Sequence, residues 1–168
     1  MDKSRTRILA LTAVFAAVAV VGSVVSFPVL GSKCSPVQHL VNILGAVFLG
    51  PFWNTACAFV ASVIRNMTGL GTPLAFPGSM CGAFLSAVAY KYFRNLPSAW
   101  FGELFGTGII GGMLSYPVAA FILGSKSAAL FTFVVPFLVS SGGGTVIAAI
   151  VTIAMKKFGI IDSNSAKE

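Results

Sequence analysis

The stretch ILALTAVFAAVAVVGSVVS, which runs from Ile8 to Ser26, contains no charged residue and follows three basic residues near the N-terminus. A transmembrane helix needs about 20 consecutive apolar residues, whereas the apolar part of a secretory signal is usually about 7 to 15 residues long. This run is longer than a signal and continues into Phe27 and Pro28 instead of ending at a small-residue cleavage site. We therefore expect it to form a retained membrane-spanning helix.

The rest of the chain has the same character. Of its 168 residues, 57% are hydrophobic and 9% are charged, and the mean hydropathy is +0.93. An ordinary globular domain carries about 25% charged residues, so a soluble fold is excluded. The expected fold class is an all-α integral membrane protein, a compact six-transmembrane-helix bundle that forms one membrane domain over residues 1–168. Glycine and proline residues separate apolar runs at about 8–26, 37–49, 52–66, 78–93, 99–123 and 130–155.

The second and third runs are short, so one kinked helix over residues 37–64, giving five spans, is an alternative to two helices that turn at Gly50-Pro51. The basic residues decide between them, because lysine and arginine gather on the cytosolic side. Six spans and a cytosolic N-terminus place most basic residues inside, whereas five spans divide them almost evenly. We predict six spans, both termini in the cytosol, and a location in the cytoplasmic membrane. The predicted cytosolic residues are Lys3, Arg5, Arg7, Lys91, Arg94, Lys156, Lys157 and Lys167, and the outer ones are Lys33, Arg65 and Lys126.

Several function classes are disfavoured. The net charge of +7 does not indicate a nucleic-acid partner, because the basic residues stand singly or in pairs between apolar runs. Three cysteines and one histidine show no disulfide or metal pattern, and no cofactor is expected. The glycines before Lys126 lack the spacing of a nucleotide-binding loop. Among the acidic residues only Glu103 falls within a span, where we expect it to pair with Lys91 or Arg94 near the cytosolic interface. These features predict a transport protein without its own energy source rather than an enzyme.

Small residues and prolines indicate how the helices pack. Glycine recurs at a spacing of four residues, as at Gly78 and Gly82, which allows helices to approach closely. Pro117 and Pro136 fall within the fifth and sixth predicted spans, and we expect both to kink their helices.

The connection between the first two spans is the most distinctive stretch. Ser35, Pro36 and Gln38 have the arrangement of a helix N-cap, a first-turn proline and a capping box, so Gln38 is either a cap or a ligand contact. His39 and Asn42 follow at a spacing that places both on one helix face. His39 is either an interfacial residue or a ligand contact, whereas the buried amide of Asn42 needs a partner on another helix or on a ligand.

Two further groups of polar residues map to the same outer half of the bundle. One group begins with Arg65, which we expect at a helix end with its side chain directed outward. A turn follows it, and then the start of the next helix with Phe76 and Ser79. These groups predict a small-ligand pocket under an extracellular lid. The predicted substrate-binding residues are Gln38, His39, Asn42, Phe76, Ser79, Tyr116, Ser140 and Ser141, and the predicted lid or outer rim contains Lys33, Cys34 and Arg65.

The ligand that we expect is small and uncharged. Lys33, Arg65 and Lys126 make the outer loops positive, and we expect no buried carboxylate on that side to balance a cation.

Several ordered blocks of this sequence resemble a known family of membrane proteins. The chain resembles the ThiW family, the thiamine-precursor (hydroxyethylthiazole) S components of energy-coupling factor (ECF) vitamin importers, most strongly from Phe27 to Arg94. The matching blocks are Phe27-Pro28-x-x-Gly31-x-Lys33-Cys34, Gln38-His39-x-x-Asn42, Leu49-Gly50-Pro51, Arg65-Asn66, Gly71-Thr72 and Leu74-Ala75-Phe76-Pro77-Gly78-Ser79-Met80.

The resemblance implies a six-helix bundle in the lipid bilayer that captures its substrate from outside. It also implies two kinds of partner, a transmembrane T component and two cytosolic ATPases, which would supply the missing energy source. In the family an Ala-x-x-x-Ala face on the first helix contacts the T component, and Ala13 and Ala17 match it, with Ala10 and Ala16 as weaker candidates.

The resemblance implies a small thiazole substrate. Hydroxyethylthiazole is neutral and could stack on Phe76 or Tyr116, with hydrogen bonds to His39, Asn42 or Ser79. Thiamine fits the positive rim poorly, and a phosphorylated thiazole is a secondary option because of the outer cations. The alternatives are a free-standing small-solute channel or facilitator and an intramembrane hydrolase that uses Ser79 or Cys81 with His39.

Overall fold

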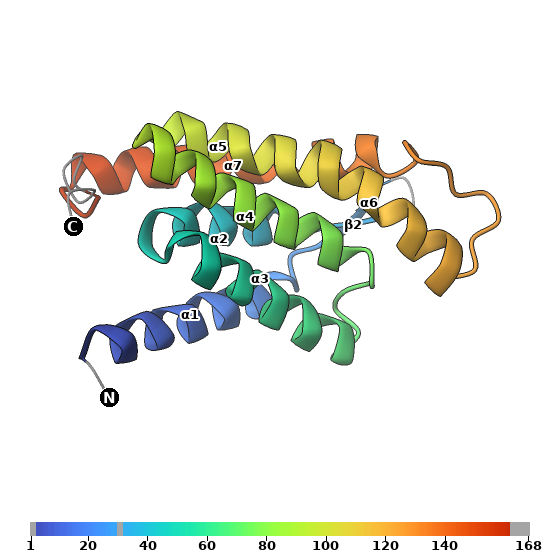
Figure 1. Cartoon of the computed structure of the whole chain (residues 1–168), viewed down its shortest axis with the longest axis horizontal. Helices are drawn as coiled ribbons and strands as arrows, with labels where there is room; N and C mark the ends of the chain where they lie inside the picture. Colours follow the sequence, from blue (N-terminus) through green and yellow to red (C-terminus); the bar gives the residue numbers. More distant parts are fainter. Residues whose placement is uncertain (1–2, 30–31, 162–168) are drawn as a thin grey trace.

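The computed structural model of the protein describes residues 3–29 and 32–161. Gly31 of the family pattern and the predicted cytosolic Lys167 lie outside the described residues. The chain is nearly all-α, and its helices lie side by side along one long axis (Figure 1). The helices are α1 (Lys3–Gly22), α2 (Pro36–Phe48), α3 (Gly50–Met67), α4 (Ala75–Phe93), α5 (Leu96–Phe105), η1 (Gly106–Gly111), α6 (Gly112–Pro117), η2 (Val118–Ile122) and α7 (Val134–Lys157), where η1 and η2 are π-helical.

The first connection contains a short hairpin that the all-α prediction did not include. There β1 (Phe27–Val29) pairs antiparallel with β2 (Ser32–Cys34), with Phe27 opposite Cys34. The first helix also ends at Gly22, earlier than predicted. A side chain at Gly22 would collide with Val37, so the first and second helices approach each other closely at this point before the chain turns away.

The chain folds back between α2 and α3, as the six-span prediction requires. Gly50 has φ +74°, a left-handed conformation that glycine adopts without strain, and Pro51 follows in the first turn of α3. The residues 37–64 therefore form two helices instead of one kinked helix. The α2 helix has 13 residues, which corresponds to a length of about 20 Å.

One continuous helical rod runs from Leu96 to Ile122, with π-helical turns at η1 and η2. It begins at an N-cap, where the side chain of Asn95 accepts a hydrogen bond from the backbone N–H of Ser98. The second π-helical segment starts directly after Pro117, so the wide turn is where the rod accommodates the missing backbone donor.

The predicted kink at Pro136 was wrong. The last helix begins at Val134, later than predicted, so Pro136 lies in its first turn. The first N–H groups of a helix have no intrahelical acceptor, and a proline there removes no hydrogen bond.

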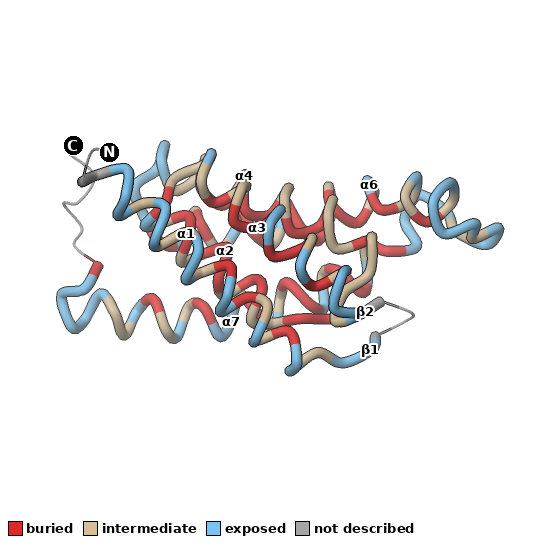
Figure 2. The backbone as a smooth tube through the Cα atoms, turned by 90° about the horizontal axis from the view of Figure 1, so that it is seen from below, coloured by how far each residue is buried: buried red, intermediate tan, exposed pale blue. Residues whose placement is uncertain are grey.

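The α4 helix lies against α2, α3, α5 and η1, and glycines allow the closest of these contacts. A Cβ atom on Gly102 would lie 2.7 Å from the carbonyl oxygen of Leu85, and one on Gly106 would lie 2.8 Å from that of Cys81. Buried residues follow the inner faces of the central helices, whereas α1 and both ends of the bundle are more exposed (Figure 2).

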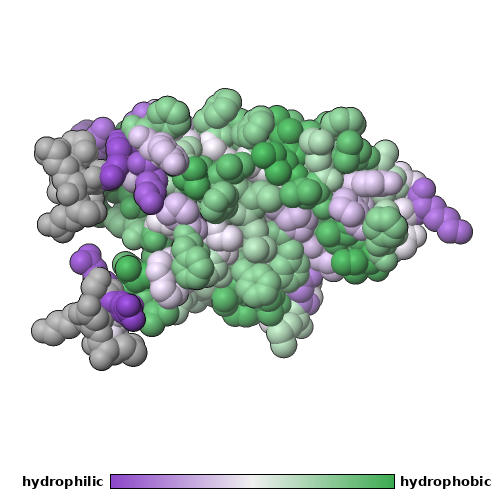
Figure 3. Space-filling view, in the orientation of Figure 1, coloured by the Kyte–Doolittle hydropathy of each residue, from purple (hydrophilic) through white to green (hydrophobic). Residues whose placement is uncertain are grey.

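The outer surface has the character of a membrane protein. In the described part of the chain, three helices are long and apolar enough to cross a membrane: Arg5–Gly22, Leu96–Ile122 and Val134–Lys157. A broad hydrophobic band covers the middle of the molecule, and hydrophilic side chains gather towards its two ends (Figure 3). The start of α1 and the end of α7 lie at the same end of the bundle (Figure 1).

Candidate functional site

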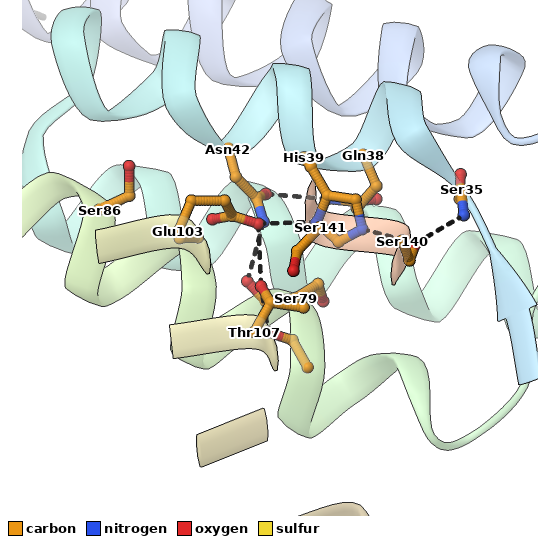
Figure 4. A network of polar contacts seen from close by, with 12 residues as sticks. Ser35, Gln38, His39, Asn42, Ser79, Ser86, Glu103, Thr107, Ser140 and Ser141 are labelled. Atoms are coloured by element: carbon orange, nitrogen blue, oxygen red, sulfur yellow. Dashed lines mark hydrogen bonds and ion pairs between the residues drawn. The ribbon is translucent and has the colours of Figure 1, made fainter. Parts of the chain in front are cut away.

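The most extensive buried polar network is centred on His39 in α2 (Figure 4). Its Nδ1 atom lies 2.8 Å from Oε1 of Glu103, and its Nε2 atom lies 2.9 Å from Oγ of Ser140. These three residues come from α2, α5 and α7, so the network joins elements that are far apart in the sequence.

Glu103 is the anchor of the network. Its Oε1 atom accepts hydrogen bonds from Nδ2 of Asn42 at 3.0 Å and from Oγ1 of Thr107 at 2.9 Å, in addition to its contact with His39. An ionised carboxylate is an acceptor only, so Nδ1 of His39 is the donor to it. In the neutral imidazole Nε2 is then an acceptor, to which the hydroxyl of Ser140 donates a hydrogen bond.

The expectation that Glu103 pairs with Lys91 or Arg94 at the interface was wrong. Glu103 is 0% exposed and lies seven residues inside the rod that begins at Leu96, about 10 Å from its end. The space for its carboxyl group exists because residue 82 is a glycine, whose Cβ would lie 2.6 Å from Oε2. The premise that no buried carboxylate lies near the pocket was therefore wrong as well.

A second part of the network connects Arg65 to Asn42. The Nη1 atom of Arg65 donates to Oε1 of Gln38 at 3.1 Å, and Nε2 of Gln38 donates to Oδ1 of Asn42 at 3.0 Å. The predicted capping box was wrong, because Ser35 makes no side-chain cap bond and Gln38 turns to its neighbours in the network. Arg65 does not extend outward as predicted: it is 3% exposed, because it projects into the bundle.

A small cavity of about 40 Å³ lies beside this network. Many of the predicted pocket residues meet there, since Gln38, His39, Ser79 and Ser140 line it together with Lys33 and Arg65 of the predicted rim. Residues that the sequence analysis did not select complete the wall: Ser35, Ala75, Gly78, Thr107 and Phe137.

The other predicted residues lie elsewhere. Phe76 packs against Phe59, with ring centroids 5.8 Å apart, and Tyr116 and Ser141 are not among the residues that line the cavity. The aromatic side chain at the cavity is that of Phe137, whose ring fits over Gly78. The sequence carried only a weak signal for Phe137 and Thr107, because both stand in apolar or small-residue runs without a local motif.

The hairpin end closes over the cavity through three contacts. The Nζ atom of Lys33 donates to the carbonyl oxygen of Gly69, the Sγ atom of Cys34 donates to that of Pro136, and the backbone N–H of Ser35 donates to Oγ of Ser140. The predicted rim residues Lys33 and Cys34 thus lie where the first connection crosses the ends of α3 and α7.

The serine next to His39 is not the one expected for a hydrolase. The hydroxyl of Ser79 contacts Oγ of Ser62 at 2.8 Å and donates to the carbonyl oxygen of Ala75. Ser140 takes the position beside the imidazole instead.

A larger cavity of about 700 Å³ lies at the opposite end of the bundle, near the start of α1. It contains none of the predicted binding residues and is lined by the ends of α2 and α4, with Arg7, Lys91 and Arg94. Between the two cavities α2 and α4 contribute fully buried residues, including Ile43 and Ala83. The smaller cavity is the better candidate site because buried polar side chains converge on it.

The first helix presents the predicted alanine face to its surroundings. Ala13 and Ala17 are exposed, whereas Ala16 is buried in a cluster with Val41 and Cys57. The face with Ala13 and Ala17 is therefore available to a partner, and Ala16 is not.

Two comparisons with known proteins bear on the identity of this chain. A comparison with curated proteins found no match. A family model described as "thiamine-precursor transporter protein (ThiW)" matches residues 9–158, which is most of the chain and all the elements that build the site. The chain therefore belongs to the ThiW family of thiamine-precursor transporter proteins.

Proposed function

We propose that this protein is the substrate-capture S component of an ECF-type importer and that it binds a thiazole-type thiamine precursor in the small cavity. It crosses the cytoplasmic membrane six times with both termini in the cytosol, so that the cavity faces the outer side. The observation that carries this proposal is the convergence of buried polar side chains from α2, α3, α4, η1 and α7 on one cavity beneath the hairpin.

The site suits a small heterocycle with polar atoms. Phe137 supplies an aromatic face, and Ser79, Thr107 and Ser140 supply hydroxyl groups around it. His39 is held in one orientation by Glu103, so its hydrogen-bonding direction is set before the ligand arrives.

Substrate entry requires the hairpin to move, because Lys33 and Ser35 at its end line the cavity and are held there by contacts with Gly69 and Ser140. The α2 helix is also shorter than the roughly 30 Å apolar core of a bilayer. The hairpin occupies the outer part of the membrane that the short α2 helix does not reach. Breaking its contacts with Gly69, Pro136 and Ser140 opens the site.

The energy for import comes from partners. The exposed alanine face at Ala13 and Ala17 is where the T component docks, and two cytosolic ATPases drive the cycle. The buried layer with Ile43 and Ala83 between the two cavities favours a capture subunit over a free-standing channel, which needs a continuous path.

Binding and uptake measurements test the proposal. The purified protein, titrated by calorimetry, is expected to bind hydroxyethylthiazole or its phosphate ester and not thiamine. Vesicles that contain the chain with its T component and ATPases should accumulate the precursor only with ATP. Tight thiamine binding without thiazole binding, or ATP-independent uptake by the chain alone, contradicts the proposal.

One observation favours a second candidate function. Ser140, His39 and Glu103 have the connectivity of a serine–histidine–acid triad, with contacts of 2.9 and 2.8 Å. A hydrolase should be labelled by a fluorophosphonate probe at Ser140, and the Ser140→Ala variant should lose the label. A capture subunit gives no labelling.

A further inference from the structure

We propose that the outer part of the cavity is an anion subsite, built by Arg65 with Lys33 and Ser35, and that the substrate carries a phosphate ester there. This inference rests on the proposed function and specifies the form of its substrate. It names the phosphate monoester of the hydroxyethyl arm in place of the free alcohol.

The first step is the burial of a guanidinium group without a counter-charge. Arg65 is 3% exposed and lines the cavity, and its Nε atom has no hydrogen-bond partner among residues 3–29 and 32–161. Its Nη1 atom donates to the neutral amide of Gln38, and the described part of the chain supplies no carboxylate to it. Removing a cation from water is costly unless an anion compensates it, so the cavity favours a ligand that brings a negative charge.

The second step is the set of donors around Arg65. Lys33 lines the same cavity, and its Nζ atom donates to the carbonyl oxygen of Gly69, an uncharged partner. Ser35 lines the cavity, and its buried hydroxyl has no partner among the residues that the structure describes. Ser35 also directly precedes α2, so the positive end of that helix borders the cavity. Two cations, a free hydroxyl and a helix N-terminus are the groups that bind phosphate in proteins.

The third step concerns the carboxylate of Glu103, which would repel an anion if it shared this part of the site. It is the only acidic residue in the described part of the chain, and its Oε1 atom lies 2.8 Å from Nδ1 of His39. The side chains of Gln38 and Asn42 separate it from Arg65, and Thr107 and His39 lie between it and the cavity. The site is thus polarised, with a positive outer part and a negative inner part.

This polarity extends the earlier expectation about the ligand. The positive rim argued against a cation, and the burial of Arg65 now argues against a wholly neutral molecule as well. A thiazole phosphate satisfies both parts, because its ester oxygens reach the cations while the ring remains near Phe137 and the hydroxyl groups.

Calorimetric titration with three probes tests the inference: hydroxyethylthiazole phosphate, hydroxyethylthiazole and inorganic phosphate. Hydrogen bonds to charged groups predict that the ester binds about 10- to 100-fold more tightly than the alcohol. The Arg65→Gln variant should lose this preference, so that the two thiazoles bind it with similar affinity, whereas Arg65→Lys should keep part of it. Lys126→Gln removes an outer positive charge that does not line the cavity, and it should preserve the preference.

The outcomes separate the two proposals. Equal or tighter binding of the alcohol overturns the anion subsite and leaves the proposed function intact, and so does an ester preference that survives Arg65→Gln or disappears in Lys126→Gln. Inorganic phosphate that binds as tightly as the ester overturns the assignment to substrate. No binding of either thiazole overturns the proposed function. Each variant is first compared with the parent by its melting temperature. If Arg65→Gln does not fold, an ester preference in Arg65→Lys that equals the parent's overturns the anion subsite, and a reduced preference supports it.

Discussion

The replacement of Glu103 by glutamine tests the central assignment of the structure, a buried carboxylate that organises three helices. Glutamine has the same shape and keeps one acceptor oxygen, so the variant removes the charge with little change in volume. The side chain is fully buried and its Oε1 atom accepts from His39, Asn42 and Thr107.

The size of the effect follows from the three hydrogen bonds. A bond to a charged acceptor contributes about 1 kcal/mol more than one to a neutral acceptor, so the three together lose up to about 3 kcal/mol. The amide NH₂ group of the new glutamine is a donor and finds no acceptor in the donors that surrounded the carboxylate, so it forms no hydrogen bond that would offset this loss. For a chain of this size, 1 kcal/mol shifts the melting temperature by roughly 2–4 °C, so the full loss corresponds to a decrease of about 6–12 °C.

The assay uses the protein's own cysteines. Cys34 and Cys57 are free and buried, so a dye that becomes fluorescent on reaction with thiols reports unfolding in detergent. Lys156→Gln, at the exposed end of α7, is the matched control because it also changes one charge without touching the network.

An interfacial glutamate paired with Lys91 or Arg94 would contribute only about 0–1 kcal/mol. A melting temperature for Glu103→Gln within about 2 °C of the parent and of the Lys156→Gln control therefore refutes the buried network.

Three further predictions concern packing, partner docking and the lid. Gly144→Ala should lower both the melting temperature and the affinity for the thiazole ligand, because a Cβ atom there would lie 2.5 Å from the Cβ atom of His39. Gly143→Ala is the control: its Cβ atom would meet open space, and both quantities should stay unchanged. Ala13→Leu should abolish co-purification with the T component without changing ligand affinity, since Ala13 is exposed, whereas Val14→Leu on the same helix should permit co-purification. Burial raises the pKa of the Cys34 thiol, outweighing the opposing effect of its hydrogen bond with a serine, so less thiolate is present at neutral pH. In a variant with only this cysteine, alkylation should be slow at pH 7, faster at higher pH and slower again with bound substrate; a rate that ignores substrate contradicts the lid.

The sequence by itself determined the environment and the division of the chain. Few charges and long apolar runs predicted an all-α membrane protein. The ordered blocks between Phe27 and Arg94 predicted the family that the comparison identifies. Local signals also located the turn at Gly50-Pro51, where glycine accepts a left-handed conformation. The sequence pattern alone singled out Gln38, His39 and Asn42, because polar residues in an apolar helix need hydrogen-bond partners.

Only the tertiary structure decided which partners these residues have. Glu103 and Arg65 looked like interfacial residues, because position along a helix gives depth but not the direction in which a side chain points. Glu103 turns inward because Gly82 on another helix leaves space for its carboxyl group, and Ser140 meets His39 because Gly144 lets α7 approach α2. Such contacts join residues about 60 to 100 positions apart, and no local pattern records them. The charge of the site, and with it the form of substrate that the site favours, therefore depends on packing between helices.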